Sequence, residues 1–172
     1  MTLLKIPSFD NIKSAKKSVS RNEIRAMYAG LESKKLESIK NHSLMYAINR
    51  TKRYLKEISD LLSPEKVITG WEDYNAEIRK LHEDLSGGKT IENPVTGEKM
   101  WNVNYGSSEY HQQLKELKDK YGITEYEQYM EGEFDEPLEK FIHYVNEKEV
   151  DKKVDIPDYG VMKLIHFLWK EE

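Results

Sequence analysis

Two stripes of large side chains, separated by a single helix-start signal, constrain the fold of this chain most strongly. In each stripe the spacings are four, three, four, three and four residues, which is the period of an amphipathic helix. The first stripe consists of Leu44, Ile48, Thr51, Leu55, Ile58 and Leu62. The second consists of Val67, Trp71, Tyr74, Ile78, Leu81 and Leu85. Ser63-Pro64 between them is typical of an N-cap followed by proline in the first turn. Because the step from Leu62 to Val67 is five residues, we expect an antiparallel helical hairpin over about residues 40–86 that turns both stripes inward.

Local signals place the elements on either side of this hairpin. Ser20-Arg21-Asn22-Glu23 has capping-box spacing, so a helix should begin there. Ser86-Gly87-Gly88 should end the second helix. Residues 89–93 and 98–105 then read as two strands joined by a turn at Pro94-Val95-Thr96-Gly97, a β-ribbon with Trp101, Val103 and Tyr105 on one face.

The remainder of the chain predicts short elements. Helices should begin at Ser107 or Ser108, at Thr124, at Asp135 and at Asp158, and residues 148–156 alternate like a short strand. We therefore predict an α+β fold that is mainly α, with an antiparallel helical hairpin, a small β-ribbon and short C-terminal helices. Residues 1–19 would form an N-terminal arm, and residues 20–172 a single domain with the ribbon and later helices over 89–172.

Composition excludes several classes of protein. The 172 residues include no cysteine, which rules out disulfides, thiol nucleophiles and cysteine-based metal sites. No apolar run approaches the ~20 residues of a membrane span, and the first ten residues lack the apolar core of a secretory signal. We therefore expect a soluble, intracellular protein that does not bind membranes.

Charge is distributed unevenly along the sequence. Residues 1–60 carry 13 Lys and Arg against 6 Asp and Glu, a net charge of +7, whereas residues 61–172 carry 14 against 25, a net charge of −11. Such a split can mark a surface that faces nucleic acid, a docking surface for a protein, or two halves that attract each other. The basic candidates for nucleic-acid binding are Lys13, Lys16, Lys17, Arg21, Arg25, Arg50, Lys52 and Arg53.

Motifs of known chemistry are missing. There is no nucleophile elbow and no dinucleotide fingerprint, and Gly88-Lys89-Thr90 lacks the first glycine and the strand–loop–helix order of a phosphate loop. We therefore predict no catalytic, cofactor-binding or metal-binding residues, and no cofactor. An alternative hypothesis is an enzyme whose metal site uses Glu136, Glu139 and His143, which would share one face of a helix.

Two groups of residues are candidates for binding a protein. Trp101 and Tyr105 lie on the aromatic face of the predicted ribbon. An acidic stretch, without an intervening lysine or arginine, contributes Glu125, Glu127, Glu131, Glu133, Asp135 and Glu136. Such a stretch is either a solvated surface with acids at helix starts or a surface for a basic partner.

The order of elements resembles a family of short proteins of uncharacterised function that are encoded by tailed phages and prophages. The matching stretches are residues 40–62, the helix end Lys120-Tyr121-Gly122, and residues 150–169 with the step Val154-Asp155-Ile156-Pro157-Asp158. Residues 1–19 and the turn at 93–97 fall outside the resemblance. The family has no established catalytic residues, so the resemblance implies only a phage context.

These observations together predict a non-enzymatic phage protein that acts by protein–protein interaction. It would be either a virion or assembly component or an antagonist of a host defence protein, located in the host cytoplasm or in the virion. The alternative is a nucleic-acid-binding accessory protein that uses the basic first 60 residues. A homo-oligomer is compatible with both, because heptad stripes pair within a chain or between chains.

Overall fold

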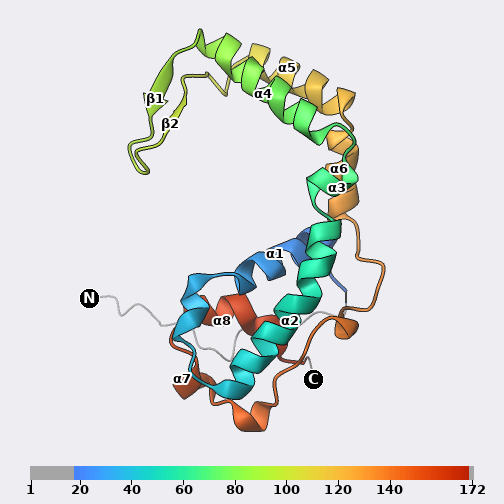
Figure 1. Cartoon of the computed structure of the whole chain (residues 1–172), viewed down its shortest axis with the longest axis vertical. Coiled ribbons are helices and arrows are strands. Elements are labelled where there is room, and N and C mark those ends of the chain that lie inside the picture. Colours follow the sequence, from blue (N-terminus) through green and yellow to red (C-terminus); the bar gives the residue numbers. More distant parts are fainter. Residues whose placement is uncertain (1–17, 171–172) are drawn as a thin grey trace, which may run out of the picture. The chain divides into compact units, whose positions relative to one another are not determined.

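The computed structural model describes residues 18–170 and confirms the predicted fold class, since the chain is mainly helical with one small two-stranded antiparallel sheet. Contacts group the chain into two compact units, whereas the sequence predicts a single domain over residues 20–172. One unit, here the discontinuous unit, runs up to Leu62 and resumes at Met130. The other, the inserted unit, is Ser63–Tyr129. Figure 1 shows the helices and strands of both units.

The discontinuous unit is built from α-helices and short 3-10 helices. They are α1 (Arg21–Leu31), η2 (Lys34–Ser38), α2 (His42–Leu61), η3 (Leu138–Lys140), η4 (Glu147–Glu149), α7 (Lys152–Asp155), α8 (Tyr159–Ile165) and η5 (His166–Leu168).

Helix α1 begins where the sequence predicted. The Ser20 hydroxyl accepts from the Glu23 N–H, and the Glu23 carboxylate accepts from the Ser20 N–H, which completes a capping box. Gly30 lies inside the helix against α8, because a Cβ placed there would lie 3.4 Å from Leu164 Cδ2. This is an ordinary van der Waals distance, so α1 and α8 are packed closely and the position still has room for a methyl group.

The first stripe becomes the buried face of α2. Leu44, Ile48 and Leu55 are almost fully buried, and Thr51 is buried with them. Both α2 and α8 pack on α1. The largest fully buried side chain of the C-terminal part is that of Trp169, which follows η5. The core of this unit therefore joins residues from both ends of the described sequence.

The segment that was expected to be a strand over residues 148–156 is helical, so that prediction was wrong. The Asp151 side chain accepts from the Lys153 N–H and caps α7, and the Asp155 carboxylate accepts from the Asp151 N–H at 2.7 Å. Val150 and Ile156 are buried but Val154 between them is 77% exposed, so the alternating apolar residues do not share one buried face. The helix expected after Asp135 is likewise only the single turn η3.

A hydrogen bond within the discontinuous unit shifts the pKa of Tyr28. The Tyr28 hydroxyl donates to Glu32 Oε1 at 2.8 Å. This bond to a carboxylate, with desolvation and the charges of Glu32 and Asp60, raises the pKa of Tyr28 from 10.0 to about 12. Because the folded pKa lies above the unfolded one, the neutral phenol contributes stability that is complete below pH 10 and is lost as the pH rises towards 12.

We expect Glu32→Gln to lower the pKa of Tyr28 towards its ordinary value, because the negative charge beside the phenol is removed. NMR of ring-labelled tyrosine across the alkaline range measures this directly. Glu37→Gln is the matched control, since Glu37 is exposed on η2 and should leave the titration of Tyr28 unchanged. An unaltered Tyr28 pKa in Glu32→Gln would contradict the assignment.

In the inserted unit, helices α4 and α5 lie side by side (Figure 1). The helices are α3 (Pro64–Val67), α4 (Trp71–Ser86), α5 (Ser108–Lys120) and α6 (Ile123–Glu131), the last of which crosses the unit boundary. His82 contacts Tyr110 near the start of α5, whereas Glu77 contacts Lys120 at its end, so the two helices are antiparallel. The predicted hairpin of residues 40–86 spans both units. Within its own unit, each helix that carries a stripe is covered by another helix: α1 covers α2, and α5 covers α4.

The core of the inserted unit is small. Ile68, Tyr74 and Ile123 are its buried cluster, and partly buried side chains surround them: Trp71, Ile78, Leu117, Tyr121 and Tyr126. Gly70 begins α4 with a φ of 79°, and a Cβ there would lie 3.2 Å from the Tyr121 ring. Both the backbone conformation and the space at this position therefore favour glycine.

Polar contacts also tie α4 to α5. Glu77 Oε1 accepts from Lys120 Nζ at 2.6 Å and from the Tyr121 hydroxyl at 2.7 Å. These two hydrogen bonds, from Lys120 and from Tyr121, lower the pKa of Glu77.

The predicted β-ribbon is confirmed with shorter strands. β1 (Thr90–Glu92) pairs antiparallel with β2 (Lys99–Trp101), and Ile91 lies opposite Met100. The turn between them contains Gly97 with a φ of 71°. Both strands are largely exposed, and Tyr105 follows β2 rather than belonging to it.

No helix in the described part of the chain has the length and apolar character needed to cross a membrane.

Candidate functional site

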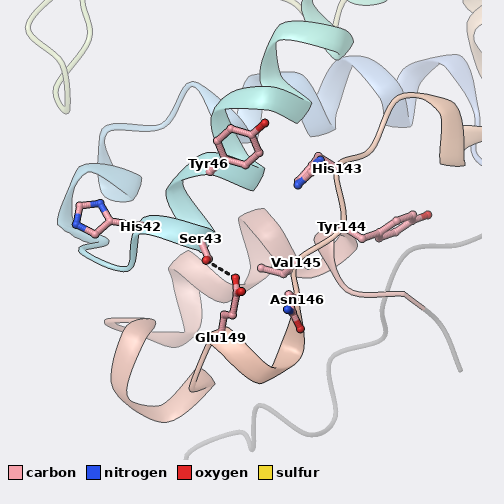
Figure 2. A pocket seen from close by; sticks show the side chains of 8 residues that line it. All are labelled: His42, Ser43, Tyr46, His143, Tyr144, Val145, Asn146 and Glu149. Carbon is pink, nitrogen blue, oxygen red and sulfur yellow. Dashed lines mark hydrogen bonds between the residues drawn. The ribbon is translucent and has the colours of Figure 1, made fainter.

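A shallow hollow of about 360 Å³ lies in the discontinuous unit between the first turns of α2 and residues 143–149 (Figure 2). It is lined by His42, Ser43, Tyr46, His143, Tyr144, Val145, Asn146 and Glu149. The Ser43 hydroxyl donates a short hydrogen bond to the Glu149 carboxylate, and Asn41 Nδ2 donates to the Glu149 carbonyl at 2.9 Å. The polar side chains at this edge of the hollow therefore hold residues 146–149 against the start of α2.

The histidines of the hollow do not converge on one point. His42 points away from the other side chains in Figure 2, whereas the His143 ring lies edge-on to Tyr46, with 5.0 Å between ring centroids. The backbone N–H of His143 donates to Thr51 Oγ1 at 2.9 Å, and Thr51 is fully buried in α2. His143 is thus positioned by the core and held against an exposed tyrosine.

The metal site considered from Glu136, Glu139 and His143 is not supported. Those residues share a face only on a continuous helix, whereas the described chain has just the turn η3 (Leu138–Lys140) between them. Within residues 18–170, no group of three or more His, Asp or Glu side chains is placed to hold a metal ion.

The basic residues that are candidates for nucleic-acid binding lie in different surroundings. Arg21 is largely buried and donates to Asp135 Oδ2 at 2.8 Å, and Lys52 pairs with Glu32 at 3.1 Å. Arg53 is exposed on α2, and Arg25 is half-buried. Lys13, Lys16 and Lys17 lie outside the described residues. The Arg21–Asp135 pair joins the basic and acidic parts of the sequence, as expected if they partly neutralise each other.

Arg50 lies among tyrosines on α2. Its guanidinium carbon is 5.9 Å from the centroid of Tyr46 and 5.5 Å from that of Tyr54, and Nη1 donates to the Tyr46 hydroxyl at 3.0 Å. Tyr46 is 54% exposed. One face of α2 therefore presents a cation and aromatic rings together.

The acidic stretch falls on both sides of the unit boundary. Glu125 and Glu127 belong to the inserted unit, and Lys118 donates to Glu127 Oε1 at 2.8 Å. The discontinuous unit carries the others: Glu131, Glu133, Asp135 and Glu136. All six acids are exposed, and Glu136 pairs with Lys140 at 3.6 Å. The stretch is thus a set of solvated acids, several with basic partners.

Tyr105, in the segment between β2 and α5, lies against rings from α4 and α5. This group is here called the aromatic surface: His82, Tyr105, Tyr110 and His111. The Tyr105 ring is edge-on to Tyr110 at 5.2 Å and to His82 at 5.6 Å. It remains 40% exposed. Trp101, the other candidate, is half-buried at the end of β2. Neighbouring rings therefore hold an exposed tyrosine in place.

A second hollow, of about 460 Å³, lies in the inserted unit where α3 and α5 meet α6. Its wall is rich in tyrosine, with Tyr121, Tyr126 and Tyr129, and Tyr129 is 43% exposed. Val67, which the sequence placed in the second stripe, is 42% exposed here, because α3 ends at Val67 and α4 begins only at Trp71.

The sequence alone indicates Tyr105 as a binding candidate, but it does not indicate the neighbours of Tyr105 or either hollow. His82 follows the buried Leu81, and Tyr110 follows the N-cap Ser107 by three residues, so each position could have been placed on its helix. The pairing of Ser43 with Glu149 bridges more than a hundred residues and has no local signal.

Comparison with models of protein families, with curated proteins and with solved structures finds no match to this chain.

Proposed function

We propose that this chain is a non-enzymatic phage protein that acts by binding another protein, and that it docks through the aromatic surface. The observation that carries this proposal is Tyr105, which is 40% exposed yet fixed by two neighbouring rings. The phage context comes from the family resemblance in its sequence. The partner is a virion or assembly protein of the phage or a defence protein of the host.

The chemistry of the aromatic surface suits a protein partner. Tyrosine is enriched among the residues that dominate binding energy at protein interfaces, because a rigid ring offers a large contact area at low entropic cost. Tyr105 needs little further ordering, since His82 and Tyr110 already restrict its ring. A partner that covers Tyr105 would also exclude water from the neighbouring hydrogen bond between His82 Nε2 and the Tyr110 hydroxyl, 3.4 Å long.

The two helices that contribute rings to the aromatic surface, α4 and α5, also carry exposed acidic side chains. Glu109 is exposed in the first turn of α5, next to Tyr110, and Glu83 is exposed on α4, next to His82. Exposed charges mainly set the rate and selectivity of association rather than its strength. We therefore propose a partner with a basic rim around an apolar or aromatic centre.

We expect the tagged full chain to capture a discrete partner, and Tyr105→Ala to weaken that capture at least about tenfold, the effect of losing an interface hot spot. Capture is compared from lysate of host cells and from purified phage particles, which separates the host antagonist from the virion component. Tyr129→Ala is the matched control, since Tyr129 is similarly exposed in the same unit but lies outside the aromatic surface.

Equal capture by wild type and Tyr105→Ala would contradict the proposed docking surface. Failure to capture any protein, together with absence from particles, would contradict the proposed function as a whole.

Arg50 with Tyr46 and Tyr54 favours a second candidate function, binding of single-stranded nucleic acid. Such proteins combine basic side chains with exposed rings on which bases stack. This candidate predicts binding to labelled oligonucleotides that weakens steeply with salt and is reduced by Arg50→Ala. A response that does not change with salt, or no binding at low salt, would exclude it.

A further inference from the structure

The outer edge of β1 carries open backbone groups. The Asn93 N–H donates to the Glu98 carbonyl at 2.8 Å, and the Asn102 N–H donates to the Lys89 carbonyl at 2.9 Å. Lys89 and Asn93, which flank β1, and Ile91 between them therefore direct their backbone groups towards β2. Because these directions alternate in an antiparallel pair, Thr90 and Glu92 direct theirs away from β2. Within the described chain no second strand pairs with that edge.

The outer edge of β2 is less available. By the same alternation, Lys99 and Trp101 face outward from β2. The Trp101 carbonyl, however, already accepts from the Val103 N–H at 2.9 Å. The ribbon thus has one fully open edge, that of β1, and such an edge is a template for pairing with another strand.

We propose that a second copy of this chain pairs with the β1 edge, forming a symmetric dimer through a four-stranded antiparallel sheet. The two-fold axis passes beside Ile91, so Thr90 of each copy lies opposite Glu92 of the other. In this register the outward N–H and C=O groups of both residues all find partners in the second copy. No open group of the β1 edge remains.

The side chains fit the same register. Ile91 is 46% exposed and Met100, its neighbour on β2, is 38% exposed. In the dimer Ile91 faces Ile91 of the second copy, which makes one apolar row of four side chains across the sheet. On the other face, Glu92 lies between Lys99 of its own ribbon and Thr90 of the second copy. Side chains of like charge do not lie opposite each other.

Charge distinguishes this register from the next one towards the turn, and it favours a second copy as the occupant. A shift of the axis to Glu92 would place two glutamates opposite each other and bring Pro94, which has no N–H, opposite Thr90. The ribbon itself is neutral, since Lys89 and Lys99 balance Glu92 and Glu98. Two identical ribbons therefore approach without net repulsion. This self-association does not depend on the protein partner proposed above.

Sedimentation equilibrium of the full chain over a concentration series tests the dimer. We expect a reversible monomer–dimer equilibrium, and Ile91→Lys should raise its dissociation constant at least about tenfold by placing two positive charges across the axis. Val95→Lys introduces the same charge in the turn of the same ribbon, where Val95 is 90% exposed and outside the proposed pairing. It should leave the dissociation constant nearly unchanged.

A mixture of Ile91→Lys with Ile91→Glu adds a test that loss of folding cannot imitate. Each variant alone should be mainly monomeric, whereas the mixture should form dimers that contain one copy of each. A wild-type chain that stays monomeric at every concentration would overturn the proposal, as would a dimer that Ile91→Lys does not weaken. Restored pairing in the mixture would support the β1 edge as the interface.

Discussion

Replacing Leu55 with alanine is expected to lower the free energy of unfolding of the discontinuous unit by about 3 kcal/mol, within the range for buried leucines. Leu55 has no exposed surface and lies in the middle of the buried face of α2. Its truncation removes apolar contacts and leaves a cavity that the helix packing only partly fills.

The same helix offers a matched control. Leu61 also lies on α2 but is 70% exposed, so Leu61→Ala should change the stability by no more than about 0.5 kcal/mol. Urea unfolding followed by circular dichroism measures the difference, and hydrogen exchange of the α2 amides assigns it to this unit. Equal losses for the two variants would contradict the placement of the buried face.

Tyr74→Ala should destabilise the inserted unit by about 3–5 kcal/mol, as expected for a large buried ring. Tyr74 is one of three residues in the buried cluster of this unit. Its ring stacks on Trp71 at 5.5 Å and lies edge-on to Tyr121 at 5.7 Å. Without it, α4 and α5 lose much of the apolar surface between them.

Hydrogen exchange, measured for amides along the whole chain, shows where Tyr74→Ala lowers protection. We expect loss of protection concentrated in Ser63–Tyr129, because this unit has its own core. Tyr74→Phe keeps the ring, so it should cost about 1 kcal/mol or less. Equal loss of protection in both units after Tyr74→Ala would show that they unfold together and would contradict the expectation.

Elements that depend on a few neighbouring residues could be predicted from the sequence. The capping box at Ser20, the N-cap at Asp158 and the helix end at Gly87 each involve contacts within about one turn, so the local sequence contains the whole signal. The β-ribbon was predicted for the same reason, because its strands are joined by a short turn.

Partners that are distant in sequence could not be predicted. The stripes of α2 and α4 share one period, and a period shows which face is apolar without showing which helix covers it. Over residues 150–156 the apolar alternation suggested a strand, but the side chain of Asp151 caps a helical turn there. Local capping therefore prevailed over a weak alternation pattern.

In the candidate sites, too, local signals could be predicted from the sequence and contacts between distant residues could not. Tyr105 could be chosen from the aromatic face of the ribbon, whereas the contact between His143 and Thr51 spans 92 positions and leaves no mark in local spacing. The acidic stretch looked continuous in the sequence, but the unit boundary divides it after Tyr129.

The order in which the discontinuous unit is synthesised follows from its division along the chain. Helices α1 and α2 leave the ribosome before the inserted unit, but the buried side chains of α8 and Trp169 follow only after it. The inserted unit can thus fold while the earlier helices still lack part of their core. Once folded, it shortens the flexible loop that must close between Leu62 and Met130, which lowers the entropic cost of completing the discontinuous unit.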